Sequence, residues 1–212
     1  MYNSKITGLG YYVPDPETLN AKDFGVPQNR ERIFIVGFHP DEKITDFEYP
    51  KKKNKVVTFA DVKEEEEVSV KYFMSTVYLQ TLKDHRARHE AKGNGFGYAI
   101  IPDTGIANSV VCGGMGRERN LVIDHRISDY TPITKIKGEV NREGIRRMTP
   151  REWARLQGYP DLAKKIRNSQ PGWKRSNGHY SGISKKGREV LAIHMLGNGV
   201  PAAMGNYIAG YV

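Results

Sequence analysis

The sequence has few of the residues that stabilise secreted or zinc-binding proteins, and it lacks the long apolar runs of membrane proteins. One cysteine in 212 residues excludes a disulfide within the chain and argues against a Cys/His zinc site. No apolar run approaches the roughly 20 residues that a membrane-spanning helix needs, and the N-terminus lacks the apolar stretch of a secretion signal. We therefore expect a soluble cytoplasmic protein.

Histidine is also scarce, and one pair of histidines could suggest a metal site. His85 and His89 are four residues apart, so they share one face of a helix. The sequence predicts a helix over residues 76–92, with Ser75 as its N-cap and Gly93 as its stop. The two histidines continue the apolar stripe of this helix. We interpret them as partly packed side chains and predict no metal site.

Acidic residues are in the minority. The formal net charge is +9 and the isoelectric point is about 9.5, which indicates a polyanionic partner, most simply nucleic acid. The basic residues cluster with glycines and aromatic residues in two stretches, KDHRARHEAKGNGFGY (83–98) and REGIRRMTPREWARLQGY (142–159). This clustering favours double-stranded DNA over a membrane surface.

The N-terminal part contains an apolar run that the chain cannot cover by itself. The run RIFIVGF (32–38) is unbroken, which is typical of a strand buried on both faces of an α/β sheet. No series of strand–helix units follows to complete such a sheet. The next part of the sequence opens with two charged stretches, 51–55 and 64–67, which we interpret as solvated surface and linker.

The clearest local signal is the stretch MTPREWARLQGYP (148–160), which predicts a short, firmly capped helix. A threonine N-cap is followed by proline at the first helical position and by glutamate at the third, which completes a capping box. Methionine and tryptophan occupy the positions of a hydrophobic staple, and glycine ends the helix. The residues concerned are Met148, Thr149, Pro150, Glu152, Trp153 and Gly158.

The stretch VVCGGMGRERN (110–120) has two opposed interpretations, a thiol beside a cofactor loop or a surface that touches DNA. A cofactor loop needs a helix after its glycines, whereas RERNLVIDHR alternates like a strand. Residues 109–124 are therefore predicted to form a hairpin or glycine-kinked ribbon. Cys112 has no neighbouring base and is interpreted as an inert packed thiol. Arg117 and Arg119 at the ribbon tip can bind guanine edges or phosphates, and a solvated turn is an equal alternative.

Three stretches resemble motifs of the DNA cytosine-5 methyltransferases, in the order of that family. VPQNRERIFIVGF resembles motif VIII, with Gln28, Arg30 and Arg32 in the matching places. RRMTPREWARLQGYPD resembles motif IX, and GNGVP (197–201) resembles motif X. The stretch between motifs VIII and IX corresponds to the target-recognition domain of the family.

The resemblance covers only the C-terminal part of such an enzyme. The sequence has no Pro-Cys dipeptide and no Glu-Asn-Val motif, which the catalytic half would carry. The expected fold class is α/β with α+β character, a remnant of a Rossmann-like catalytic sheet plus a small β-rich target-recognition domain. Residues 1–40 would end the catalytic domain, 41–185 would form the target-recognition domain with the motif IX helix (146–161), and 186–212 would form the motif X turn and a C-terminal helix.

The function that the resemblance implies is methylation of C5 of cytosine in a specific duplex sequence, as in restriction-modification systems, with S-adenosylmethionine as methyl donor. In the family a cysteine thiolate adds to C6 of a flipped cytosine, and Cys112 falls in the recognition region. We therefore expect activity only with a partner chain that carries the catalytic cysteine and most of the cofactor site. The alternative is a truncated, catalytically inactive DNA-binding remnant. A nuclease finds little support, and the expected location is the cytoplasm of a bacterium, an archaeon or a phage-infected cell, at the nucleoid.

Site residues are carried over by the same resemblance. Arg30 and Arg32 would line the active-site cleft, with Arg32 near the flipped cytosine, and Ser109 stands where the family contacts the DNA backbone. Gly199 departs from the serine or alanine that is usual in motif X. The predicted sets are Gln28, Arg30 and Arg32 for catalysis; Asn198, Gly199 and Val200 for the cofactor; and Lys92, Asn94, Ser109, Arg117 and Arg119 for DNA.

Overall fold

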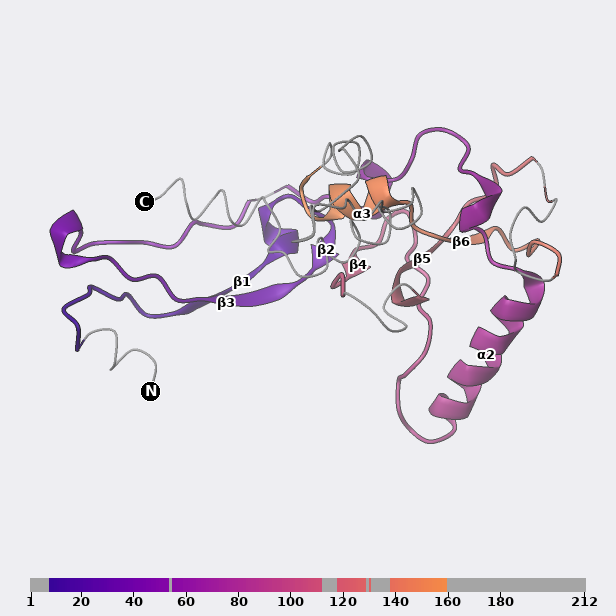
Figure 1. The fold of residues 1–212 in the computed structure, drawn as a ribbon, viewed down its shortest axis with the longest axis horizontal. Helices are drawn as coiled ribbons and strands as arrows, with labels where there is room; N and C mark the ends of the chain where they lie inside the picture. Colours follow the sequence, from indigo (N-terminus) through magenta and orange to yellow (C-terminus); the bar gives the residue numbers. More distant parts are fainter. Residues whose placement is uncertain (1–7, 54, 112–117, 129, 131–137, 160–212) are drawn as a thin grey trace, which may run out of the picture.

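The computed structural model describes residues 8–53, 55–111, 118–128, 130 and 138–159, and Figure 1 shows their arrangement. The strands are β1 (Glu17–Asn20), β2 (Gln28–Asn29), β3 (Glu31–Phe34), β4 (Ala107–Asn108), β5 (Leu121–Ile123) and β6 (Ile145–Arg147). The α-helices are α2 (Thr76–Glu90) and α3 (Pro150–Leu156), and the short 3-10 helices are η1 (Ala21–Phe24), η2 (Pro40–Glu42), η3 (Phe59–Asp61) and η4 (Val70–Tyr72).

The described strands form small sheets of two strands each. β1 pairs antiparallel with β3, β2 pairs parallel with β4, and β5 pairs antiparallel with β6. In Figure 1 the β1–β3 pair and its continuations extend to one side, α2 stands at the other side, and α3 lies between them. The mixed helix and strand content agrees with the predicted α/β class with α+β character.

The strand predicted over 32–38 is shorter than expected, because β3 ends at Phe34. The side chains of Ile33 and Ile35 are 64% and 44% exposed. β3 has β1 as its neighbour, and no described element covers the isoleucines. This exposure agrees with the expectation that the chain cannot cover the run by itself. Beyond the strand the chain is held by Phe38, which is buried and stacks on Tyr12 at 5.9 Å between ring centroids.

The main apolar core lies where η3, β4, β5 and α3 meet. The capping-box helix contributes its buried face, because Trp153, Ala154 and Leu156 recur at helical spacing. Met148 and Trp153 share this cluster, as the predicted staple requires. The buried members are Phe59, Val62, Ile101, Ala107, Val110, Val122, Met148, Trp153, Ala154 and Leu156.

Helix α2 agrees with its prediction to within two residues. The Ser75 side chain accepts a hydrogen bond from the backbone N–H of Tyr78, as an N-cap should, and the helix ends at Glu90. Gly93 follows with φ of 73°, in the left-handed region that glycine adopts without strain.

The histidine pair on α2 is partly buried, which confirms the interpretation of packed side chains. The rings of His85 and His89 lie 4.4 Å apart between centroids. His89 also shares a hydrogen bond of 2.8 Å with the side chain of Asn94. Among the described residues, no group of three or more His, Cys, Asp or Glu side chains could hold a metal ion.

The acidic stretch 64–67 is exposed at residues 65–67, as expected of solvated surface, but it is anchored to the protein and is not a free linker. Glu64 accepts a hydrogen bond of 2.8 Å from the hydroxyl of Thr149, and its backbone N–H donates to Glu152 at 3.0 Å. Glu67 accepts a hydrogen bond from the hydroxyl of Ser128 at 3.0 Å. These carboxylates have partners far along the chain, which a local charge pattern cannot reveal. Residues 51–53 are exposed, as predicted.

Of the predicted ribbon 109–124, the structure describes residues 109–111 and 118–124. β5 in the second part pairs with β6, and β4, which directly precedes the ribbon, pairs with β2. The side chain of Asn120 accepts from the N–H of Asn108, the residue before the ribbon, at 2.7 Å and donates to its carbonyl at 3.2 Å. Because the glycine-containing tip lies outside the described residues, the choice between a hairpin and a glycine-kinked ribbon stays a prediction.

Within the described ranges, no helix is both long and apolar enough to span a bilayer.

Candidate nucleic-acid interface

Gln28 connects three segments that are distant in sequence. Its side chain is fully buried, its Nε2 donates to the carbonyl of Leu156 at 2.8 Å, and its Oε1 accepts from the N–H of Val110 at 3.1 Å. The end of α3 and the segment after β4 are thus held against β2. The two bonds satisfy backbone groups that would otherwise be buried without partners.

Arg30 extends this junction. It is 3% exposed, and its Nη1 donates to the hydroxyl of Ser109 at 3.1 Å and to the carbonyl of Val110 at 2.6 Å. Its backbone N–H donates to the side chain of Asn20 at 3.1 Å. The structure therefore brings together Gln28, Arg30 and Ser109, three residues that the sequence selected separately. Ser109 is held by an internal arginine, and Arg30 faces the protein interior.

Arg32 is placed differently. It lies on β3 opposite Leu19 and is partly exposed, and its Nη1 donates to the carbonyl of Glu31 at 2.5 Å. This bond stays within its own strand and does not include the junction of Gln28 and Arg30. Its guanidinium is thus the motif VIII side chain that a ligand can reach, whereas that of Arg30 is enclosed.

Replacing Gln28 by alanine is expected to lower the free energy of unfolding by about 2–3 kcal/mol. The substitution leaves the N–H of Val110 and the carbonyl of Leu156 buried without partners, and each such group costs about 1–3 kcal/mol. Urea denaturation followed by circular dichroism would measure the change. Gln80→Ala is the matched control, because Gln80 is exposed and bonds only within α2 among the contacts described, and a change within about 0.5 kcal/mol is expected there. Equal effects of the two variants would contradict the bracing role of Gln28.

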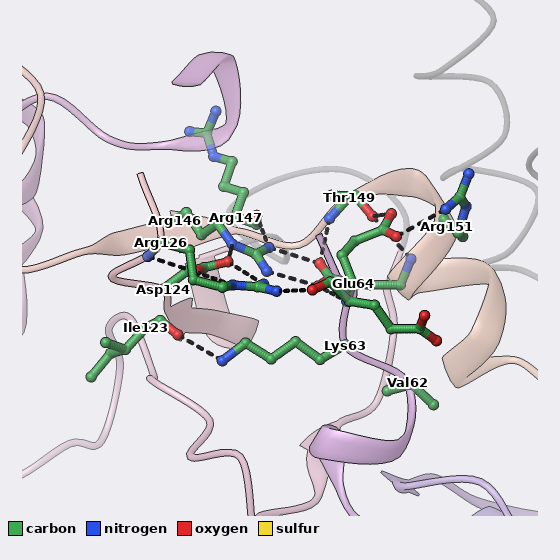
Figure 2. Close-up of polar contacts among 12 residues, drawn as sticks. Val62, Lys63, Glu64, Ile123, Asp124, Arg126, Arg146, Arg147, Thr149 and Arg151 are labelled. Carbon is green, nitrogen blue, oxygen red and sulfur yellow. Dashed lines mark hydrogen bonds and ion pairs between the residues drawn. The ribbon is translucent and has the colours of Figure 1, made fainter. Parts of the chain in front are cut away.

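The structure also contains a buried ion network, drawn in Figure 2. Arg146 is fully buried, and its Nη1 and Nη2 donate to the two oxygens of Glu152, both at 2.8 Å. Its Nε donates to Asp124 at 2.9 Å. Arg126 donates to both oxygens of the same carboxylate, at 2.8 and 2.7 Å. The network ties β5, β6 and α3 together.

The charges of the network are balanced within it. Burial alone would raise the pKa of Asp124, but the hydrogen bonds from Arg126 and Arg146 outweigh burial and hold this pKa well below its usual range. Burial opposes the charged form of Arg146, and its bonds to Glu152 raise its pKa nonetheless. Asp124 and Arg146 are therefore both charged at neutral pH.

Glu152 has a second role at the start of α3. Its carboxylate accepts from the N–H of Thr149 at 2.8 Å, and the Thr149 hydroxyl accepts from the N–H of Glu152 at 3.1 Å. This confirms the predicted capping box, with Pro150 at the first position and Gly158 at φ of 73° after the helix. The pairing of Arg146 with Asp124 has no local sequence signal, since the two residues are 22 positions apart.

The predicted DNA-binding residues are dispersed over the described part. Lys92 and Arg119 are exposed, Asn94 is partly buried against His89, and Ser109 bonds to Arg30. An exposed aromatic side chain that the sequence reasoning did not select, Phe96, is 64% exposed and packs its edge on His89 at 5.7 Å. The sequence does contain a signal for this residue, because Phe96 is an aromatic residue between two glycines in a basic stretch. Cys112, Arg117, Asn198, Gly199 and Val200 lie outside the described residues.

The sequence matches a known family over nearly its whole length. The family is described as C-5 cytosine-specific DNA methylase, and the match covers residues 2–211. The type II methyltransferase M.HpaII of Haemophilus parainfluenzae is 69% identical over 153 residues, which are 72% of this chain and 43% of that protein. The type II methyltransferase M.DsaV of Dactylococcopsis salina is 32% identical over 153 residues, 71% of this chain and 39% of that protein. The chain thus spans about two fifths of the length of these relatives.

The fold is similar to part of solved methyltransferase structures. The methyltransferase EhMeth of Entamoeba histolytica superposes with a TM-score of 0.60 at 15% identity, over 99% of this chain and 55% of that one. The Dnmt2 methyltransferase of S. pombe gives a TM-score of 0.60 at 14% identity, over 99% of this chain and 60% of that one. At this level of identity the comparisons establish the fold alone.

Proposed function

The chain belongs to the C-5 cytosine-specific DNA methylase family, and from that premise we propose that it is the target-recognition part of a DNA cytosine-5 methyltransferase. The observation that carries the proposal is the junction of Gln28 and Arg30 with Val110, Ser109 and Leu156. It holds the motif VIII residues Gln28 and Arg30, the segment after β4 and the motif IX helix in one unit. Such a unit would keep a recognition surface at a fixed position relative to the motif VIII residues.

The reaction requires a complementary chain in this proposal. The sequence lacks the Pro-Cys dipeptide of the family, and its relatives are more than twice as long as the matched part. The exposed isoleucines Ile33 and Ile35 support this reading, because aliphatic side chains on a two-stranded sheet offer an apolar face to a further layer. We propose that this layer is the catalytic half that carries the thiolate.

The cofactor site belongs mostly to the same missing half. An adenosyl group is bound where a strand leads through a glycine-rich turn into a helix, and in the described part α2 and α3 begin instead after Ser75 and Thr149. The starts of these two helices therefore do not fit S-adenosylmethionine, which would supply the methyl group when bound. The contribution proposed for this chain comes from Asn198, Gly199 and Val200. The other roles proposed here are to bind the duplex, to orient it and to present Arg32 toward the extruded cytosine.

Methyl transfer is expected only when both halves are present. The experiment measures incorporation of labelled methyl groups from S-adenosylmethionine into mixed-sequence duplex DNA. It uses this chain alone, a chain with the Pro-Cys catalytic half alone, and the mixture of the two. Incorporation in the mixture alone would support the proposal. Incorporation by this chain alone would contradict it, because no thiolate has been assigned here.

A second candidate function is a DNA-binding remnant without catalysis. It is favoured by the excess of basic over acidic residues, 33 Lys and Arg against 24 Asp and Glu. With a net charge of +9, such a module would bind duplex DNA with strong salt dependence. Silence of the mixture in the methyl-transfer assay, together with salt-sensitive binding by this chain, would favour this function.

A further inference from the structure

Arg119 is an exposed residue between two buried polar residues. Glu118 is 5% exposed and Asn120 is fully buried, while Arg119 is exposed. This alternation fixes the direction of the arginine, because a rotation of the segment would break the hydrogen bonds of both neighbours inside the protein. Buried polar groups that lose their partners cost free energy, so the orientation is maintained.

Glu118 connects Arg119 to three other segments. Its Oε1 accepts from the hydroxyl of Tyr78 on α2 at 3.2 Å and from Nη2 of Arg147 on β6 at 2.7 Å. Its backbone carbonyl accepts from the N–H of Ala99 at 2.9 Å, directly after the glycine-rich stretch 93–97. The guanidinium of Arg147 also lies 5.5 Å from the centre of the Tyr78 ring. One carboxylate thus sets the position of the segment relative to α2 and β6.

The other side of Arg119 is held just as firmly. The side chain of Asn120 binds both the N–H and the carbonyl of Asn108, at 2.7 and 3.2 Å. The side chain of Asn108 in turn donates to the carbonyl of Arg119 at 2.8 Å. The backbone of the arginine is therefore fixed before and after its Cα, and freedom remains only in its side chain.

We propose that Glu118 is a positioning residue for target recognition, which holds Arg119 so that its guanidinium reads one base pair of duplex DNA. A guanidinium binds the O6 and N7 atoms of guanine through two parallel hydrogen bonds. A fixed backbone lowers the entropy lost when such a pair forms, so a firmly held arginine discriminates better than a mobile one. The inference rests on the proposed function. It adds Arg119 as the residue that reads the base pair and Glu118 as the residue that positions Arg119.

The test is selection of bound duplexes from a random-sequence library by the full chain, followed by sequencing. The unmodified chain is expected to enrich a defined sequence, and Arg119→Ala to lose about 10- to 100-fold of its preference at one base pair. Glu118→Ala should relax the preference at that same base pair by about tenfold, with smaller changes elsewhere. Glu118→Gln keeps the size and an acceptor, so most of the preference should be retained. Adding Glu118→Ala to Arg119→Ala should change nothing further at that base pair.

Asn141→Ala is the control for a merely structural effect. Asn141 is buried, and its side chain bonds to Met74 and to Ile145, so its loss lowers stability without touching the Glu118 contacts. Its selected sequence should equal that of the unmodified chain. An unchanged preference in Arg119→Ala or in Glu118→Ala overturns the inference alone. A failure of the unmodified chain to enrich any sequence overturns the proposed function, and the inference with it.

Discussion

Replacing Arg146 by alanine is expected to lower the free energy of unfolding by about 3–5 kcal/mol, because removal of one partner from a buried ion pair leaves an uncompensated buried charge. Here the loss affects two carboxylates, those of Asp124 and Glu152. Arg126 can still pair with Asp124 at one edge of the network. Glu152 would retain its backbone donors from Thr149 and Glu64, but no hydrogen-bonded cation among the described residues.

The measurement is equilibrium denaturation in urea at neutral pH. Arg126→Ala is the matched control, since this arginine contacts the same carboxylate from a side chain that is 37% exposed. Water can replace it, and a loss of about 1 kcal/mol is expected from an exposed pair. A second comparison, Arg146→Met with Asp124→Asn and Glu152→Gln, removes the charges together and should recover part of the stability. An Arg146→Ala variant as stable as Arg126→Ala would show that the buried network contributes little.

The capping-box helix could be predicted from the sequence because all of its signals are local. Thr149, Pro150, Glu152 and Gly158 act on backbone groups within their own turn, and the structure confirms each of them. The N-cap and the end of α2 follow the same logic. Periodicity and capping therefore gave α2 to within two residues and the start of α3 at Pro150. The wider bounds 146–161 expected for the motif IX helix are wrong, because Arg146 and Arg147 belong to β6 and α3 ends at Leu156.

The ion network and the sheet partners could not be predicted, because they depend on pairing across distance. The sequence predicts Glu152 as a capping residue, and no neighbouring residue indicates that Arg146 and Asp124 are also buried beside it. The sequence of the ribbon 109–124 alternates, but this alternation does not reveal that β5 pairs with β6. The run 32–38 has the composition of a covered strand, and composition does not say which polypeptide supplies the cover.

The same distinction applies to the candidate site. The resemblance to motif VIII predicted Gln28, Arg30 and Arg32 as one set of site residues. Only the structure shows that the three side chains differ in burial. The first two are enclosed at the junction, with Arg30 bonded to Ser109 at 79 residues' separation. Arg32 lies two residues beyond Arg30, on β3, and is partly exposed. Their substitution should therefore give different phenotypes.

Arg32→Ala is expected to reduce methyl transfer by the assembled halves at least about 100-fold, while DNA affinity changes by less than about threefold. In the proposed enzyme this guanidinium faces the extruded cytosine, and removing one such electrostatic contact typically costs about 10²–10³ in turnover. The fold should be preserved, because the described bond of Arg32 goes to the carbonyl of its own neighbour Glu31. Single-turnover transfer of labelled methyl groups and binding of duplex DNA would be measured on the same preparations.

Two further variants make the result specific. Lys51→Ala removes another exposed cation, and its transfer rate should stay within about threefold of the unmodified pair, since a surface charge acts weakly through solvent. Arg30→Ala should fail in a different way, because it opens the junction at Ser109 and Val110 and so lowers stability together with activity. If Arg32→Ala transferred methyl groups at the unmodified rate, its placement at the active site would be wrong. If it lost stability as Arg30→Ala does, its role would be in the junction and not at the cytosine.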